Sequence, residues 1–234
     1  MTIVTVGSEV PGLVDRLADQ AANEIISQIY QRHPELLQRF GEKGKVTCRQ
    51  DLLYHIEYLS ASLYGGDDSP FRDYVRWLAN VLETRGVPVG HLQESLLLLQ
   101  GFFLKQLPAV SFLSVDSVLQ AGIDALADTG AEPPTFRRLM PEPLPQSGDY
   151  LQALLDGNRL RAQETVLSTM RNRVSLVDVS MAVVQPAMYE IGALWQRNHI
   201  TVAQEHMATA ITQNILAQAF TAADFAAPPV RAGR

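Results

Sequence analysis

The sequence has little of several features that would place it in a common class of protein. A single cysteine, Cys48, excludes an internal disulfide. There is no basic excess, because 19 Lys and Arg face 25 Asp and Glu, giving a formal net charge of −6. No overall positive field therefore attracts a nucleic-acid backbone. Neither a long uncharged apolar run nor a basic-then-apolar leader is found, so we expect a cytoplasmic globular protein without a membrane or nucleic-acid partner.

The patterns of β-strands and of common catalytic sites are also missing. Alternating Val, Ile and Thr residues between Gly-rich turns do not occur, whereas apolar residues repeat at helical intervals. No Ser/His/Asp, Cys/His or metal-ligand spacing stands out. The sequence therefore predicts an all-α fold, and a protein that is neither an enzyme nor a metal-binding protein.

Proline and glycine divide the chain into helical segments. With 234 residues, two domains are the expected number. In the first half, helices are predicted over 11–31, 47–65, 69–86, 88–104 and 114–128, with a capping box at Thr47 and Gln50 opening the second. In the second half, they are predicted over 149–156, 159–171, 175–197 and 201–223, with a kink at Pro186. Four such helices pack naturally as a bundle.

Five prolines between Glu132 and Gln146 interrupt any helix there. We therefore predict a domain over 1–130, a Pro-rich linker over 131–147 and a second domain over 148–225. Residues 226–234 are interpreted as a tail or as the start of a further domain.

The most informative stretch is QPAMYEIGALWQRNHITVAQEHMAT, residues 185–209. Thr201 and Gln204 form a second capping-box pattern, so two helices are predicted to meet at a tight corner beside Trp195. On the second helix, Glu205 is expected to point away from the core, with His206 on its flank. The residues expected to face the core are Ala203, Met207, Ile211, Ile215 and Ala219. An indole, a carboxylate and an imidazole on one surface suit a flat apolar ligand with polar substituents.

The spacing W-x9-E-H within IGALW…ITVAQEH, preceded by LLDGNRLRAQE, resembles the helical cap of cobalamin photoreceptors and, more distantly, of corrinoid methyltransferases. The resemblance implies a four-helix cap that covers the upper face of adenosylcobalamin. It implies that Trp195 packs over the adenosyl group, and that Glu205 and His206 contact the group and its surroundings. Taken singly, each of the three side chains also fits an ordinary structural role.

Two departures from this pattern bear on the cobalt ligands. Gln196 follows the tryptophan where some cobalamin photoreceptors have a cobalt-binding histidine, so His199 or His206 would have to replace it. The D-x-H-x-x-G motif that supplies the lower ligand in a Rossmann-like module is missing. We therefore expect that a Rossmann-like module on the same full-length chain or on a separate protein completes the site.

Residues 10–128 resemble the non-haem globin-like sensor domains of bacterial regulators, through LLYHIEYLSASLYGG, FRDYVRWLANVLETRGVP and HLQESLLLL. Photocobilins join such a domain to a cobalamin module and bind a bilin, which implies biliverdin as a second cofactor here. The candidate bilin contacts are Tyr54, His55 and Tyr58, with Arg49, Arg72 and Arg76 as propionate partners and Cys48 as a thioether donor. Haem, with His55 or His91 as its axial ligand, is an alternative.

The leading hypothesis is thus a light-sensing, cobalamin-binding regulatory protein that works as a homo-oligomer. Breakage of the cobalt–carbon bond by light would shift the cap and alter subunit contacts. Two alternatives stay open: a corrinoid methyl carrier that serves an enzyme, and a helical signalling module without a cofactor.

Overall fold

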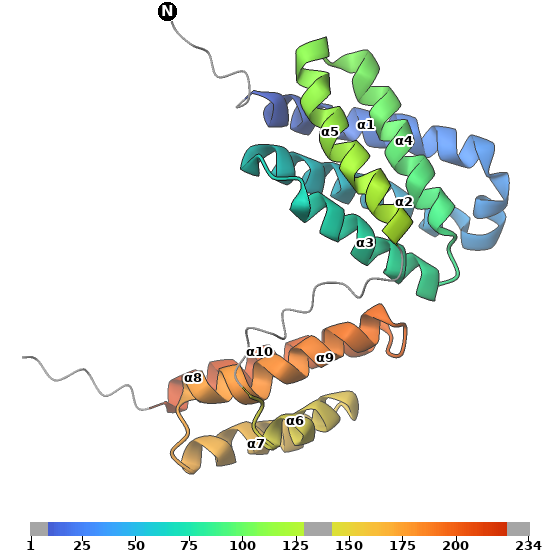
Figure 1. Ribbon diagram of the computed structural model, residues 1–234. Helices are drawn as coiled ribbons and strands as arrows, with labels where there is room; N and C mark the ends of the chain where they lie inside the picture. The colour runs from blue at the N-terminus through green and yellow to red at the C-terminus, as the bar shows by residue number, and fades with distance from the viewer. Residues whose placement is uncertain (1–8, 129–141, 224–234) are drawn as a thin grey trace, which may run out of the picture. The chain divides into compact units, whose positions relative to one another are not determined.

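The computed structural model describes residues 9–128 and 142–223, and every regular element in these ranges is a helix (Figure 1). The predicted all-α fold is therefore confirmed. The chain divides into two compact units, Met1–Pro134 and Thr135–Arg234. Each unit has its own apolar core. Within the described ranges, no helix is both long enough and apolar enough to span a membrane. Most of the predicted linker and the tail lie outside the described residues.

In residues 9–128, the described part of the first unit, the structure has five α-helices and a short 3-10 turn. They are α1 (Val10–Arg32), α2 (Pro34–Gly65), α3 (Ser69–Thr84), α4 (Val89–Gln106), α5 (Ala109–Ala125) and η2 (Leu126–Asp128). The predicted helices at 11–31, 69–86 and 88–104 are confirmed to within a few residues. Prolines explain these starts, because Pro11 and Pro70 lie in the first turn of their helices and Pro88 directly precedes one.

Two boundaries in the first unit differ from the prediction. Helix α2 begins at Pro34 rather than at residue 47 and contains a kink at Gly41, where φ is 64°. Thr47 is therefore inside a helix, and its hydroxyl donates to the Lys43 carbonyl at 3.1 Å instead of capping. The capping-box interpretation was wrong, since a Thr-x-x-Gln pattern occurs in helix interiors as well. Helix α5 begins at Ala109 because the extended Pro108 precedes it.

Close packing of α3 against α5 depends on the absence of a side chain at Gly122. A Cβ atom there would lie 2.4 Å from Cε1 of Phe71, a ring that is fully buried. Ile25, Leu59 and Leu96 are fully buried in the same core. Burial of side chains of this size contributes about 1.5 to 3 kcal/mol each.

The second unit contains four helical segments, as predicted: α6 (Gln146–Leu155), α7 (Arg159–Arg171), the run α8–η4–α9 and α10 (Val202–Ala222) (Figure 1). The run consists of α8 (Leu176–Val179), the π-helical turn η4 (Ser180–Val184) and α9 (Gln185–Gln196). Helix α7 has the bounds expected from the sequence. Gly157, in the left-handed region at φ 64°, ends α6, and the Asn158 side chain caps α7 by accepting from Arg161 N–H at 3.0 Å.

The π-helical turn lies directly before Pro186. Proline has no N–H, so it cannot satisfy the Ala182 carbonyl four residues earlier. That carbonyl accepts instead from the Leu144 N–H at 2.8 Å, and the Val183 carbonyl accepts from the Ser147 hydroxyl at 3.1 Å. Carbonyls at the widened turn therefore hold the start of the second unit in place.

The core row predicted on α10 is confirmed in part. Ile211, Ile215 and Ala219 are buried, but Ala203 and Met207 are exposed. Four residues advance a helix by about 400°, so an i,i+4 row turns by about 40° at each step and leaves the core within a few steps. At the start of the helix, Ala208 faces the core instead, with no exposed surface.

Candidate functional site

The corner between α9 and α10 is a helix C-terminus closed by backbone hydrogen bonds. Asn198 adopts the left-handed conformation, with φ 60°. Its N–H donates to the Trp195 carbonyl at 3.0 Å, and the His199 N–H donates to the Leu194 carbonyl at 2.8 Å. This pair of bonds is a Schellman motif, in which asparagine substitutes for the usual glycine. It fixes Trp195 in the last turn of α9, one short connection before α10.

The start of α10 is fixed by the predicted capping box, which is confirmed. The Thr201 hydroxyl accepts from the Gln204 N–H at 3.2 Å, and the Thr201 N–H donates to the Gln204 Oε1 at 2.9 Å. Glu205 follows in the first turn, where the helix dipole favours a carboxylate. The cap therefore sets the position of the two polar side chains that follow it.

Glu205 and His206 form a hydrogen-bonded pair. His206 Nδ1 lies 2.6 Å from Glu205 Oε2, and the Thr209 hydroxyl donates to Glu205 Oε1 at 3.0 Å. An ionised carboxylate can only accept, so Nδ1 is the donor in this hydrogen bond. The His206 side chain is 74% exposed and that of Glu205 is 27% exposed. Glu205 thus lies at the edge of the bundle and orients an exposed imidazole, rather than pointing away from the core as predicted.

Exposed or half-buried apolar side chains lie at the end of α9 and in the first turns of α10. Trp195 is half-buried, with part of its ring packed on the core of the second unit. Val202 and Met207, in the first turns of α10, are 51% and 53% exposed. The α6–α7 turn borders this region, because a Cβ atom on Gly157 would lie 3.2 Å from the Met207 sulfur. We call Trp195, Val202, Glu205, His206 and Met207 the cap surface.

His199 is an exposed corner residue. It stays a prediction as a cobalt ligand. Gln196, the residue that follows the tryptophan, is half-buried.

The tyrosines and histidine predicted for the first unit are brought together by Tyr74, which the sequence interpretation missed. His55 is 3% exposed, and its Nδ1 shares a hydrogen bond with the Tyr74 hydroxyl at 2.7 Å. Tyr58 stacks on Tyr74 with a centroid separation of 4.0 Å, and Tyr54 and Tyr58 are 46% and 42% exposed. The pattern gave no signal for Tyr74, because it occupies an ordinary core position of α3.

Burial strongly shifts several pKa values in this cluster. It lowers the pKa of His55 to about 4 and raises the pKa of Asp51 to about 6. It also raises the pKa of the Tyr74 phenol, with a smaller contribution from the Asp51 charge. The pKa of the Cys48 thiol rises to about 11 through burial, which disfavours the thiolate that a thioether bond requires. The interior of this cluster is therefore uncharged near neutral pH except at Asp51.

The arginines predicted as propionate partners each have a polar partner within the first unit. Arg49 Nη2 lies 2.5 Å from Asp19 Oδ1, and its Nε donates to Asn23 Oδ1 at 2.7 Å. Arg72 of α3 pairs with Asp68, the residue before this helix, at 3.3 Å, and Arg76 pairs with Asp73 of the same helix at 3.5 Å. An incoming propionate would have to compete with these carboxylates.

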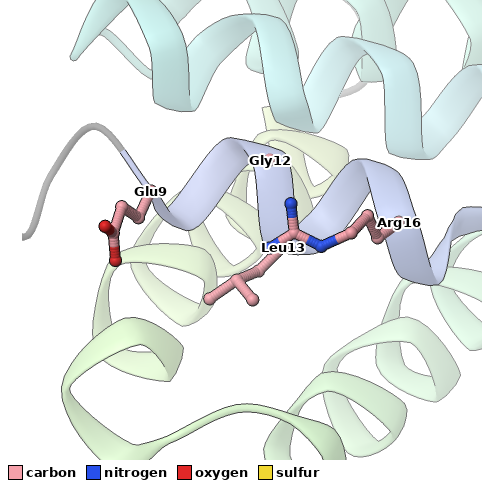
Figure 2. Close-up of a pocket in the computed structure, with 4 residues that line it drawn as sticks. All are labelled: Glu9, Gly12, Leu13 and Arg16. Atoms are coloured by element: carbon pink, nitrogen blue, oxygen red, sulfur yellow. The ribbon is translucent and has the colours of Figure 1, made fainter.

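Two surface pockets of the described residues are lined by none of the candidate site residues. One, of about 410 Å³, is lined by Glu9, Gly12, Leu13 and Arg16 at the start of α1 (Figure 2). The other, of about 460 Å³, is lined by Asn214, Ala217, Gln218 and Thr221 on α10. Each is lined by a single helix, so neither encloses a ligand. The cap surface requires no enclosed cavity, because a lid supplies one wall of a pocket.

Comparison with known proteins gives one match. Residues 147–219 match the family model described as the B12 binding domain. This range runs from the first turn of α6 through most of α10 and includes Trp195, Glu205 and His206. Searches of curated proteins and of solved structures found nothing similar to the chain. The second unit of this all-helical chain therefore carries a B12 binding domain in the form of a helical cobalamin cap.

Proposed function

We propose that the chain senses light, with its second unit covering the upper face of adenosylcobalamin. The observation that carries the proposal is the cap surface: a half-buried indole at the corner, followed on the next helix by a carboxylate-oriented imidazole. The fit to the cofactor is chemical. Apolar surface on Trp195, Val202 and Met207 suits the flat face of a corrin or of an adenine.

Each residue of the cap surface has a distinct task in this proposal. Trp195 excludes water and packs against the upper ligand. Glu205 orients His206 through Nδ1, so that Nε2 points outward and is the ring nitrogen available to the ligand. Adenosylcobalamin, when bound, supplies a cobalt–carbon bond that visible light breaks.

The signal arises from a difference in affinity. A ligand shifts a conformational equilibrium only by as much as it binds one state more tightly than the other. If the cap binds the intact cofactor about tenfold more tightly than the photolysed one, the equilibrium changes by about 1.4 kcal/mol. The role is therefore regulatory rather than enzymatic.

Further parts of the proposal concern partners and location. The cap covers one face of a corrin, so a Rossmann-like module that binds the other face is the expected partner. Altered contacts within a homo-oligomer then transmit the signal, and the protein works in the cytoplasm. These parts rest on the resemblance to cobalamin photoreceptors and on the B12 binding domain match.

We also propose biliverdin as the ligand of the first unit, at the surface formed by Tyr54 and Tyr58 over the buried Tyr74–His55 pair. The support is the exposed aromatic surface and its link to a buried imidazole through the 2.7 Å hydrogen bond. A red or far-red absorbance band after addition of biliverdin tests it. The band is expected to weaken in Tyr58→Ala and to persist in Tyr64→Ala, which removes another exposed tyrosine of α2.

The central test uses the chain's two tryptophans, Trp77 and Trp195. In a Trp77→Phe background, adenosylcobalamin added in the dark is expected to quench Trp195 fluorescence saturably, and green light is expected to weaken binding. Glu205→Gln should weaken binding, whereas Tyr189→Ala, which removes an exposed aromatic side chain of α9, should not. Absence of saturable quenching would contradict the cap contact, and equal affinity before and after illumination would contradict light sensing.

A further inference from the structure

Two histidines and a glutamate meet where the α1–α2 corner contacts the start of α4. His33 separates α1 from α2, because the residue before Pro34 is disfavoured in helical geometry and adopts φ −124° and ψ 66°. His91 and Glu94 lie in the first two turns of α4, three positions apart, and so share a helix face. All three are half-buried. They belong to the first unit and lie outside the B12 binding domain.

The potential ligand atoms of these three side chains are close together. One nitrogen of each histidine and one carboxylate oxygen of Glu94 all lie within 4.8 Å of one another. His33 Nε2 is 2.6 Å from Glu94 Oε2, and the two imidazole rings are perpendicular at a centroid distance of 4.8 Å. Ligands of a tetrahedral cation with bonds of about 2.0 Å are separated by about 3.3 Å. Small side-chain rotations are enough to reach that spacing.

We propose that His33, His91 and Glu94 bind one divalent transition-metal cation of the Zn²⁺ type. Two imidazoles and one carboxylate are a ligand set that such cations favour. The surroundings also match a metal site, because His33 Nδ1 lies 3.2 Å from Glu35 Oε1. A carboxylate behind one ring nitrogen fixes the tautomer and directs the other nitrogen, Nε2, toward the metal. The fourth coordination position is left for water or a ligand.

The same contacts also allow a corner without a metal. Arg32 Nη1 pairs with Glu94 Oε1 at 2.9 Å, and His33 bonds to the second oxygen of the same carboxylate. Arg32 leaves Oε2 for the cation, so the ion pair is compatible with binding. The two arrangements differ at His91, which the hydrogen-bonded corner does not need and the metal site does.

Co²⁺ titration of the full chain, followed by visible absorbance, distinguishes a metal site from a corner held by hydrogen bonds alone. We expect one Co²⁺ per chain, displaced by Zn²⁺, and a rise in Tm with Zn²⁺. His91→Gln and Glu94→Gln should abolish both effects, and Glu35→Gln should weaken affinity by about 10- to 100-fold. The matched control is Glu164→Gln, which removes an exposed carboxylate of α7 in the other unit, and it should bind normally.

Three results would overturn the proposal. They are the absence of a saturable Co²⁺ spectrum, binding that survives His91→Gln, and binding that is lost in the control. Circular dichroism of each variant without metal checks that the helices are intact. The most informative variant is His91→Gln, because in the described structure no hydrogen bond to the His91 ring stabilises the corner.

Discussion

Replacing Asp51 by asparagine is expected to make the stability of the first unit fall as the pH falls below neutral. Burial lowers the pKa of His55 from 6.5 to about 4, so its contribution is fully present above pH 6.5 and is lost toward pH 4. Burial raises the pKa of Asp51 from 3.8 to about 6, so its contribution has the opposite sign and is lost as the pH rises through 6. In the parent protein the two effects nearly cancel.

The magnitude follows from these pKa values. One pKa unit corresponds to about 1.4 kcal/mol, and between pH 6.5 and 4.5 each group alone changes the free energy of unfolding by about 2 kcal/mol. Asp51→Asn should therefore lose about 2 kcal/mol more than the parent over this interval. His55→Gln should gain about 2 kcal/mol relative to the parent, and the double variant should follow the parent. Cys48 and Tyr74 stay neutral in this range, because their pKa values are raised.

Urea unfolding monitored by tryptophan fluorescence provides the measurement. In a Trp195→Phe background, Trp77 is the only tryptophan, and it lies 6.2 Å from Tyr74 between ring centroids. It therefore reports the unfolding of the first unit alone. Equal pH slopes for the parent and Asp51→Asn would refute the reasoning, because they would show that folding does not move a proton from imidazole to carboxyl.

Three further substitutions test the packing and capping of the two units. Gly122→Ala should destabilise the first unit by about 1 to 3 kcal/mol, since the new methyl group meets the buried Phe71 ring, and thermal unfolding would show a matching drop in Tm. Thr201→Ala should cost the second unit about 1 kcal/mol through loss of the cap on α10, as measured by urea unfolding of the Trp77→Phe protein. Tyr150→Phe should lower the free energy of unfolding by about 1 kcal/mol in the same assay, because the buried Thr212 hydroxyl loses a 2.9 Å hydrogen bond. An unchanged midpoint would mean that the nearby methionine sulfur alone satisfies the Thr212 hydroxyl.

The helix boundaries that sequence could predict are those with chemical markers. Thr201 with Gln204 opened α10 as expected, because these side chains satisfy free N–H groups at the start of the helix. Asn158 caps α7 in a similar way in the structure. Thr47 belongs to the same kind of capping-box pattern but lies inside α2. That helix begins earlier, at Pro34, which fits the first turn of a helix as well as the end of the preceding one.

The candidate cap residues could be singled out from the sequence because they lie close together in it. Trp195, Glu205 and His206 lie within a few helical turns of one another, and the B12 binding domain match covers them. Tyr74 and the His33–His91–Glu94 cluster were missed because their partners are far apart in sequence and meet only after the helices pack. Sequence spacing does not predict such long-range contacts.

Hydrogen bonds at the π-helical turn before Pro186 connect the helical run α8–η4–α9 to the first described residues of the second unit. The Ala182 carbonyl, which proline cannot use, accepts a hydrogen bond from the Leu144 N–H, within the Pro-rich stretch. The same helical run continues without interruption to the Trp195 corner. The indole therefore lies near the end of the run, and the hydrogen bonds near its middle attach the run to the residues that precede α6. A displacement of this helical run would therefore either break the hydrogen bonds to Leu144 and Ser147 or move these two residues with the run.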